Sequence, residues 1–516
     1  MTAQASDHRV IVGQTGQNVL GLAIGAVATF AAQVLITNAL GDQAFGVVTL
    51  TTQAAFIAAS ATRFGMDVAN VRLVAILAGR GEVARARGLV RRSALIGASV
   101  SIPFGIVAFL ASPWLAERFT AIPDVAEPAF QAAAITVPFA ALAFVYMGAT
   151  RGLKIMRYTL YSQWIVQPIG WVVLMIAFWA VSQTAGMTTL AFGASWAAAL
   201  LVAFGGWARE ERRFAPAAAG GVGIPEEHTG SLVRFGALRA PATLFSQLIF
   251  WTDMFVLSIL WSDQGSTGAA QVGIYSAVLY SGQALFLFLT SVSLTFSPFV
   301  ADLHHRGERE QLDALYKNVT RWTLAATIPV LLVLGILPEA TLRIFGEDFT
   351  TGSTALRILI AGMIVPVMVG TVGFILIMAG RTGWDLAIYL GAFVIDIGVA
   401  LALAGPGDLG IRCAALAQAL TLTFSAIARL LLVRRFLGIW PFDGPWLRLL
   451  VPAAAGAMTM AVVHAAMPEA KWFLDLVVSA AAGTAVYGGA LLLIGLSPTE
   501  RAALTRVIRR RSVPAG

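Results

Sequence analysis

Residues 10–41 read VIVGQTGQNVLGLAIGAVATFAAQVLITNALG and contain no charged side chain. A helix needs about 20 predominantly apolar residues to cross the hydrocarbon core of a bilayer, and within lipid it satisfies its own backbone hydrogen bonds. Further uncharged stretches occupy residues 43–62, 93–116, 129–150 and 158–208. The pattern predicts an all-α polytopic membrane protein with fourteen transmembrane helices. Their predicted centres lie near residues 28, 53, 104, 139, 172, 198, 248, 285, 331, 366, 394, 421, 459 and 484.

Composition and charge agree with this fold class. Hydrophobic residues make up 58% of the chain and charged residues 12%, whereas a soluble domain has about 25% charged residues. Of the 35 Lys and Arg residues, 30 fall in one set of alternating loops. Positive loops stay in the cytoplasm, so we expect both termini to be cytoplasmic. The net charge of +8 is dispersed over these loops and does not indicate a nucleic-acid partner.

Few residues suggest a metal or cofactor site. Cys413 is the single cysteine, which excludes an internal disulfide and a cysteine-based metal cluster. The adjacent pair His304–His305 would point about 100° apart on a helix, which makes a poor chelate. We therefore expect no metal and no cofactor.

The chain repeats itself at an offset near 226 residues. Arg80-Gly81-Glu82 matches Arg306-Gly307-Glu308, Pro103 matches Pro329, and Phe45-Gly46-Val47 matches Val272-Gly273-Ile274. Six spans separate the two copies, so both copies have the same orientation and are related by an axis along the membrane normal. The predicted organisation is a six-helix lobe at 1–208, a cytoplasmic linker at 209–235, a six-helix lobe at 236–433, and a helix pair with a basic tail at 434–516.

Several short motifs resemble those of a known transporter family. They are Leu40-Gly41-Asp42-Gln43-Ala44-Phe45-Gly46, Arg63-Phe64-Gly65-Met66-Asp67, Val272-Gly273-Ile274-Tyr275, Phe345-Gly346 and Asp408-Leu409-Gly410-Ile411-Arg412. In order and spacing the chain resembles bacterial Wzx-like oligosaccharide flippases of the multidrug/oligosaccharidyl-lipid/polysaccharide exporter (MOP) superfamily. The resemblance implies two six-helix lobes in the bacterial inner membrane. It also implies movement of undecaprenyl-diphosphate-linked sugars to the periplasmic leaflet, for lipopolysaccharide or exopolysaccharide synthesis.

Polar residues follow one face of each of four predicted spans, at helical spacing. In the superfamily the first, second, seventh and eighth spans face the central cavity, and these are the four spans with polar faces. Such residues often serve helix packing alone, so the charged members carry more weight. The expected substrate-binding residues are Asn18, Gln33, Gln53, Arg63, Arg239 and Gln283.

The charged candidates have distinct expected roles. Arg63 and Arg239 lie at the predicted cytoplasmic ends of the second and seventh spans, one in each lobe, and Arg suits a diphosphate through paired hydrogen bonds. Asp253 and Asp396 are carboxylates within predicted spans, where an ionisable group is costly and usually functional. We expect these two to take part in coupling or gating. The first and eighth spans carry no Lys or Arg, which departs from the lipid II branch of the superfamily and favours surface or exported polysaccharide.

Two other classes of function remain open. A cation-coupled drug or organic-cation antiporter of the same superfamily would use Asp253 for its coupling ion. A membrane-embedded polysaccharide polymerase or ligase is less compatible, because the predicted periplasmic loops are short and carry no paired carboxylates set for acid–base chemistry. We expect no enzymatic activity. The expected partners are the lipid-linked oligosaccharide, membrane lipids, and a polysaccharide polymerase or export machinery.

The basic asymmetry predicts a topology that reporter fusions can test. Fusions near Gly265 and Gly352 should read periplasmic, and fusions near Gly220 and Gly307 should read cytoplasmic. Two reversed readings among these four would overturn the predicted orientation.

Overall fold

The computed structural model describes residues 3–79, 82–153, 155–214, 230, 240–241, 243–379, 381–403, 410–467 and 471–495. These residues are almost entirely helical and include no strand. They form two compact units, residues 1–277 with 389–418 and residues 278–388 with 419–516. The unit boundaries fall within the helices α11, α16 and α17.

Eleven helices in the described part of the chain are long and apolar enough to span a membrane. They include twelve of the fourteen predicted span centres, because the stretch Gly21–Thr62 covers the first two. A kink at Gly41, with φ 79°, divides that stretch. The predicted spans near residues 248 and 285 are not among the eleven. The all-α polytopic membrane fold is therefore confirmed, and the count of fourteen stays a prediction.

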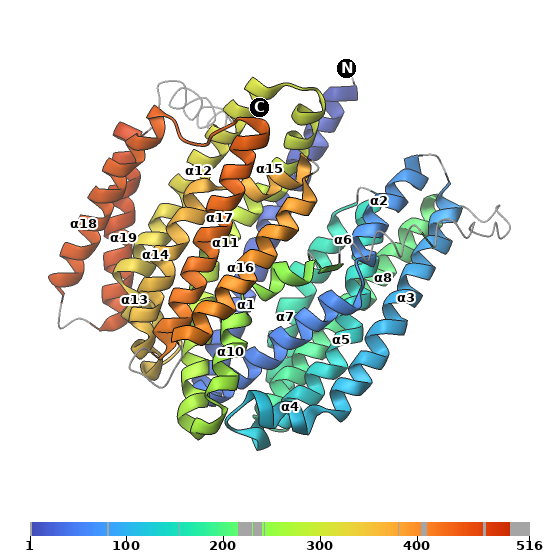
Figure 1. Ribbon diagram of the computed structural model, residues 1–516, viewed down its shortest axis with the longest axis horizontal. Helices are drawn as coiled ribbons and strands as arrows, with labels where there is room; N and C mark the ends of the chain where they lie inside the picture. The colour runs from blue at the N-terminus through green and yellow to red at the C-terminus, as the bar shows by residue number, and fades with distance from the viewer. Residues whose placement is uncertain are drawn as a thin grey trace, which may run out of the picture. The chain divides into compact units, whose positions relative to one another are not determined.

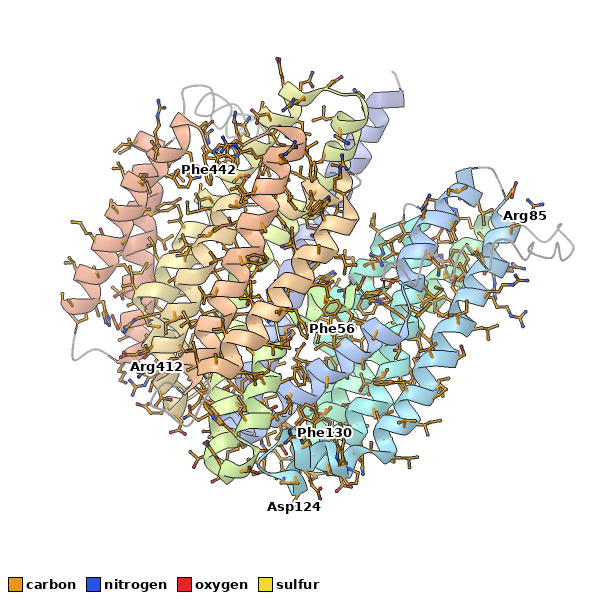
Figure 2. The ribbon with its side chains drawn as sticks, in the orientation of Figure 1. Phe56, Arg85, Asp124, Phe130, Arg412 and Phe442 are labelled. Atoms are coloured by element: carbon orange, nitrogen blue, oxygen red, sulfur yellow. The ribbon has the colours of Figure 1, made fainter. Side chains whose placement is uncertain are left out.

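The first unit is a helical bundle (Figure 1). It contains α1 (Ala3–Thr62), α2 (Met66–Gly79), α3 (Val83–Leu110), α4 (Ser112–Phe119), α5 (Pro123–Gly152), α6 (Arg157–Thr159), the π-helical turn η1 (Leu160–Val166), α7 (Gln167–Trp179), α8 (Ala185–Phe214), α10 (Thr252–Leu260), the short η2 (Ser262–Gln264) and the start of α11 (Gly265–His305). Within it α5 packs against α2, α3 and α8. Arg85 and Asp124 lie at opposite ends of this bundle (Figure 2).

The second unit continues α11. It adds α12 (Arg309–Ile336), α13 (Pro338–Leu342), η3 (Glu347–Gly352), α14 (Ser353–Val369), α15 (Val372–Met378), parts of α16 (Thr382–Leu403) and α17 (Ile411–Leu437), η4 (Gly444–Leu449), α18 (Leu450–Ala465), α19 (Trp472–Ala490) and the π-helical η5 (Leu491–Gly495). In this unit α12 packs against α14, and α18 packs against α19. The predicted lobes at 1–208 and 236–433 follow the sequence repeat rather than these compact units, and they stay a prediction.

Small residues allow the closest helix contacts within each unit. A Cβ atom on Gly148 of α5 would lie 2.8 Å from the Asp67 Cα of α2, and one on Gly152 would lie 2.9 Å from the Asn70 carbonyl oxygen. These glycines stand four residues apart, the small-xxx-small spacing that lets membrane helices approach closely. A glycine also allows close contact between α18 and α19, where a Cβ on Gly456 would lie 3.0 Å from the Gly483 carbonyl oxygen.

Large apolar side chains on the outer faces of both units point away from the protein. Leu110 and Leu201 of the first unit are 74% and 71% exposed, and Met458 and Leu493 of the second unit are 70% and 74% exposed. A water-soluble protein rarely exposes so many large apolar groups together. These faces are suited to contact with lipid tails.

The α2–α5 contact predicts a stability difference between two glycines. Gly148→Ala should lower the free energy of unfolding by about 1–3 kcal/mol, because a methyl group forced between two backbones overpacks the contact. Gly205→Ala on α8 is the matched control, because nothing lies within 4 Å of its added Cβ. Thermal unfolding in detergent should separate the two variants. Equal melting temperatures would contradict this assignment of the α2–α5 contact.

Candidate functional site

Arg63 lies in the turn that joins α1 to α2. The next two residues, Phe64 and Gly65, have φ values of 51° and 67°. Phe64 is the one residue other than glycine with a positive φ in the described part of the chain, and a bulky residue in that region is strained. Strain of this kind persists where the surrounding structure holds it, and it is frequent at ligand sites.

The Arg63 side chain is buried inside the first unit. Arg63 is 6% exposed, and its guanidinium carbon lies 4.4 Å from the centre of the Phe144 ring on α5. Its Nε lies 3.5 Å from Asp67 Oδ2, and Asp67 is also buried, with 5% of the residue exposed. The Nε and Nη1 groups of Arg63 and the Oδ1 atom of Asp67 have no hydrogen-bond partner in the structure. Buried polar groups are nearly always satisfied, so this pair leaves donors available to a ligand or to water.

Arg151, at the end of α5, adds a second positive charge to this pair. Its charge interacts with those of both Asp67 and Arg63, and its Nε donates to the Met147 carbonyl oxygen at 3.3 Å. Two guanidinium groups and one carboxylate therefore interact electrostatically, and their charges sum to +1. Guanidinium groups suit phosphate oxygens. Sequence reasoning did not single out Arg151.

Three aromatic side chains pack together beside Arg63. Phe144 contacts Phe56 of α1 with ring centres 5.8 Å apart and Trp196 of α8 with ring centres 5.2 Å apart. Phe56 and Trp196 also contact each other, with ring centres 6.2 Å apart. A cation over such a ring is attracted by its π-electrons, which helps to offset the cost of burying the guanidinium.

The helix predicted to carry Asp253 is interrupted just before it. Residues 243–248 are helical, residues 249–251 form a turn, and α10 begins at Thr252. Asp253 thus lies in the first turn of a separate helix rather than partway along a continuous one. The backbone N–H groups at such a helix start favour a negative charge, and the Asp253 Oδ1 atom accepts a hydrogen bond of 2.9 Å from the Met254 N–H.

Tyr275 and Asp396 complete a buried acidic cluster with Asp253. The Tyr275 hydroxyl donates to Asp253 Oδ2, and the Tyr275 side chain also interacts electrostatically with Asp396. All three residues are 0% exposed. Asp253 lies seven residues before the end of α10, and Asp396 lies seven residues before the end of α16. Each residue is therefore about 10 Å from the end of its helix. Tyr275, which sequence reasoning did not assign, therefore hydrogen-bonds to one predicted intramembrane carboxylate and interacts electrostatically with the other.

The other predicted substrate-binding residues do not form one site in the described part of the structure. Gln33 is 1% exposed, and neither its amide nitrogen nor its amide oxygen has a hydrogen-bond partner in the structure. Gln53 of the first unit and Gln283 of the second are half-buried. Arg239 and the Asn18 side chain lie outside the residues that the structure describes. Their predicted roles in substrate binding stay predictions.

A family comparison identifies the chain. The profile of the family described as "Polysaccharide biosynthesis protein" matches residues 14–304, which is more than half of the 516 residues. The chain belongs to this family. The match covers Arg63, Arg151, Asp253 and Tyr275. No curated protein matches the sequence.

Solved structures show the fold of this polysaccharide biosynthesis protein. It is similar to the lipid II flippase MurJ in an inward closed conformation, with a TM-score of 0.66, 14% identity, and coverage of 92% of this chain and 98% of MurJ. It is also similar to an inward-facing multidrug resistance MATE family transporter of the MOP superfamily, with a TM-score of 0.65, 15% identity, and coverage of 82% and 98%. The resemblance to MOP superfamily flippases is confirmed by the family match and the fold. The chain thus shares the fold of these membrane transporters, and its described part has several helices long and apolar enough to span a membrane.

Proposed function

We propose that this protein flips a lipid-linked oligosaccharide from the cytoplasmic to the periplasmic leaflet of a bacterial inner membrane. The observation that carries the proposal is the cationic cluster of the buried Arg63 and the half-buried Arg151, which lies within the part of the chain that matches the family. A diphosphate joins the lipid to the sugar in undecaprenyl-linked substrates. The unpartnered Arg63 donors suit its oxygens, because arginine can bind two phosphate oxygens at once.

The charge distribution supports this direction of transport. The loops that hold 30 of the 35 Lys and Arg residues are suited to the cytoplasmic face. Arg63 and Arg151 stand at helix ends next to two of these loops, where a headgroup would enter from the cytoplasm. Both termini are then cytoplasmic as well. On the other face, we propose that a polysaccharide polymerase or export machinery takes up the flipped saccharide.

The repeat supports transport by alternating access between two lobes. In the first copy α3 has 28 residues with Pro103 at its twenty-first position, and in the second copy α12 has 28 residues with Pro329 at its twenty-first position. Glu82 and Glu308 precede these helices at equivalent positions. Transporters built from such repeats commonly bind substrate where the copies meet and rock about that site.

The acidic cluster supports a coupling role for Asp253 and Asp396. Two carboxylates and a phenol in a water-poor interior can take up a proton or a monovalent cation and release it when the surroundings change. The same cluster favours a second candidate function, a cation-coupled antiporter of the same superfamily. The two functions differ in their cargo, since an antiporter for organic cations has no use for the positive Arg63 cluster.

Replacing Arg63 should reduce flipping while the protein still inserts. Arg63→Ala removes a charge-assisted contact worth about 1.5–3 kcal/mol, which corresponds to roughly a tenfold to hundredfold loss of affinity for the diphosphate. Arg63→Lys should restore part of the activity, because lysine keeps the charge without the planar fork. The measurements are lipid-linked sugar retained in the inner leaflet and polysaccharide at the cell surface.

Two controls separate this effect from a loss of folding. Arg85→Ala removes a half-exposed arginine that pairs with Glu82, and it should leave flipping unchanged. The double variant Arg63→Ala, Asp67→Ala removes both buried charges, so it avoids the cost of leaving Asp67 unpaired but should still flip poorly. Full polysaccharide output from this double variant would show that the diphosphate is held elsewhere.

Replacing Asp253 should uncouple transport from its driving ion. Asp253→Asn keeps the shape and the hydrogen bond from the Met254 N–H but cannot take up or release a proton. Transport by this variant should lose its dependence on an imposed proton or sodium gradient, measured in proteoliposomes. Ser258→Ala is the matched control, because Ser258 is a buried polar residue on the same helix whose hydroxyl donates to the Phe255 carbonyl oxygen. An unchanged gradient dependence in Asp253→Asn would remove Asp253 from the coupling step.

A further inference from the structure

On the outside of the first unit, the start of α3 lies beside the end of α8. Both helices pack against α5 (Figure 1). Arg87, the fifth residue of α3, forms an ion pair with Glu211, the fourth residue from the end of α8. We name the surface on either side of this ion pair the α3–α8 seam. The ion pair fixes which residues of the two helices lie at the same level.

On the α3 side, the seam changes from charged to apolar within two helical turns. Arg91 follows Arg87 by four residues and precedes Leu95 by four, so the three side chains share one face of the helix. Arg87 and Arg91 are exposed, and Leu95 is 60% exposed. Arg91 therefore lies about 6 Å further along α3 than the ion pair, at the edge of the lipid-facing apolar surface.

The α8 side of the seam has the same arrangement. Arg212 directly follows Glu211 and is exposed. Leu201 and Gly205 precede Arg212 by eleven and seven residues, which places them on its face of the helix. Leu201 is 71% exposed, and nothing lies within 4 Å of a Cβ built on Gly205. Each side of the seam therefore has one exposed arginine next to an open apolar face.

The middle of the seam is backed by apolar side chains of α5. The half-exposed Phe204 of α8 contacts Tyr146 of α5, with ring centres 5.2 Å apart. On the other side, a Cβ built on Gly97 of α3 would lie 3.5 Å from the Val145 Cγ2 of α5. The surface below the two arginines is thus aromatic and aliphatic, which suits contact with acyl chains.

The positive charge at the seam is not neutralised by the acidic residues beside it. The carboxylates of α8 and of the α3 N-cap each have an arginine partner already. These pairs are Glu82–Arg85, Glu210–Arg157 and Glu211–Arg87. Among the described residues, Arg91 and Arg212 form no ion pair with a carboxylate. Basic residues at the edge of a membrane span attract anionic lipid headgroups.

We propose that the α3–α8 seam binds an anionic phospholipid of the surrounding membrane. Arg91 and Arg212 hold the phosphate from its two sides, because guanidinium groups bind phosphate oxygens through charge-assisted hydrogen bonds. The acyl chains lie along the exposed faces that carry Leu95 and Leu201. The bound lipid reinforces the contact between α3 and α8 that Arg87 and Glu211 begin. The site is separate from the Arg63 cluster, and it does not depend on the cargo that the protein moves.

Thermal unfolding of the full-length protein in detergent tests the site. Added phosphatidylglycerol should raise the melting temperature, because a ligand that binds only the folded state stabilises it. Phosphatidylethanolamine with the same acyl chains should have little effect, since its ammonium group cancels the phosphate charge. The variant Arg91→Gln, Arg212→Gln should need roughly thirtyfold more phosphatidylglycerol for the same rise, at roughly fivefold per arginine.

A matched variant controls for the loss of two positive charges. Arg434→Gln, Arg435→Gln removes two exposed arginines from the last turn of α17 in the second unit, and it should respond to phosphatidylglycerol as the wild type does. Since Arg91 and Arg212 are exposed, their double variant should melt like the wild type when no lipid is added. A wild-type response of that variant to phosphatidylglycerol, or an equal rise with phosphatidylethanolamine, would overturn the proposal.

Native mass spectrometry identifies the occupant. The wild type should retain phosphatidylglycerol at detergent concentrations that strip it from the Arg91→Gln, Arg212→Gln variant. Inorganic phosphate at the same concentration should not raise the melting temperature, and an equal rise would show a site for phosphate rather than for a lipid. Retention of a polyprenyl diphosphate in place of phosphatidylglycerol would assign the seam to the cargo and overturn the proposal. Neither measurement requires flipping, so failure of the proposed function leaves this result intact.

Discussion

Burial of charge inside an apolar bundle is the constraint on which the rest of this structure depends. Isolated charges in a low-dielectric interior are costly, so each needs a partner or a function. In the second unit the buried Asp385 is paired with Arg429, whose Nε lies 3.0 Å from Asp385 Oδ1. This pair is balanced and links α16 to α17. The Arg63 cluster, by contrast, has two positive groups for one carboxylate, which is why it suggests an anionic ligand rather than a structural clasp.

The membrane constraint also explains how much of the fold could be predicted from the sequence. Lipid requires long uncharged helices, so stretches such as residues 129–150 predict α5 closely. The interruption at residues 249–251 could not be predicted, because Ile249, Phe250 and Trp251 include no glycine or proline that commonly breaks a helix. It depends on tertiary contacts, and it changes the setting of Asp253 from the middle of a helix to the start of one.

The site was only partly accessible to sequence reasoning, for a related reason. Arg63, Asp253 and Asp396 can be identified from the sequence because a charge within or at the end of an apolar stretch is conspicuous. Arg151 lies at the boundary between a span and a basic loop, where arginine is common and carries no signal. Tyr275 is an ordinary amphipathic residue until the fold places its hydroxyl on Asp253. Both acquire their roles from contacts between distant segments, which a linear pattern does not contain.

In the proposed function, the cationic and acidic clusters have different roles. Arg63 and Arg151 would bind the cargo, and Asp253, Tyr275 and Asp396 would bind the driving ion. The central claim is that the cargo is an anionic lipid-linked oligosaccharide. Its most direct test is a flipping assay with the purified protein in liposomes, in which labelled polyprenyl-diphosphate oligosaccharide becomes accessible to an impermeant enzyme outside. We expect flipping of this substrate, and little transport of organic cations under the same gradient. Gradient-driven transport of organic cations without movement of the lipid-linked sugar would contradict the claim.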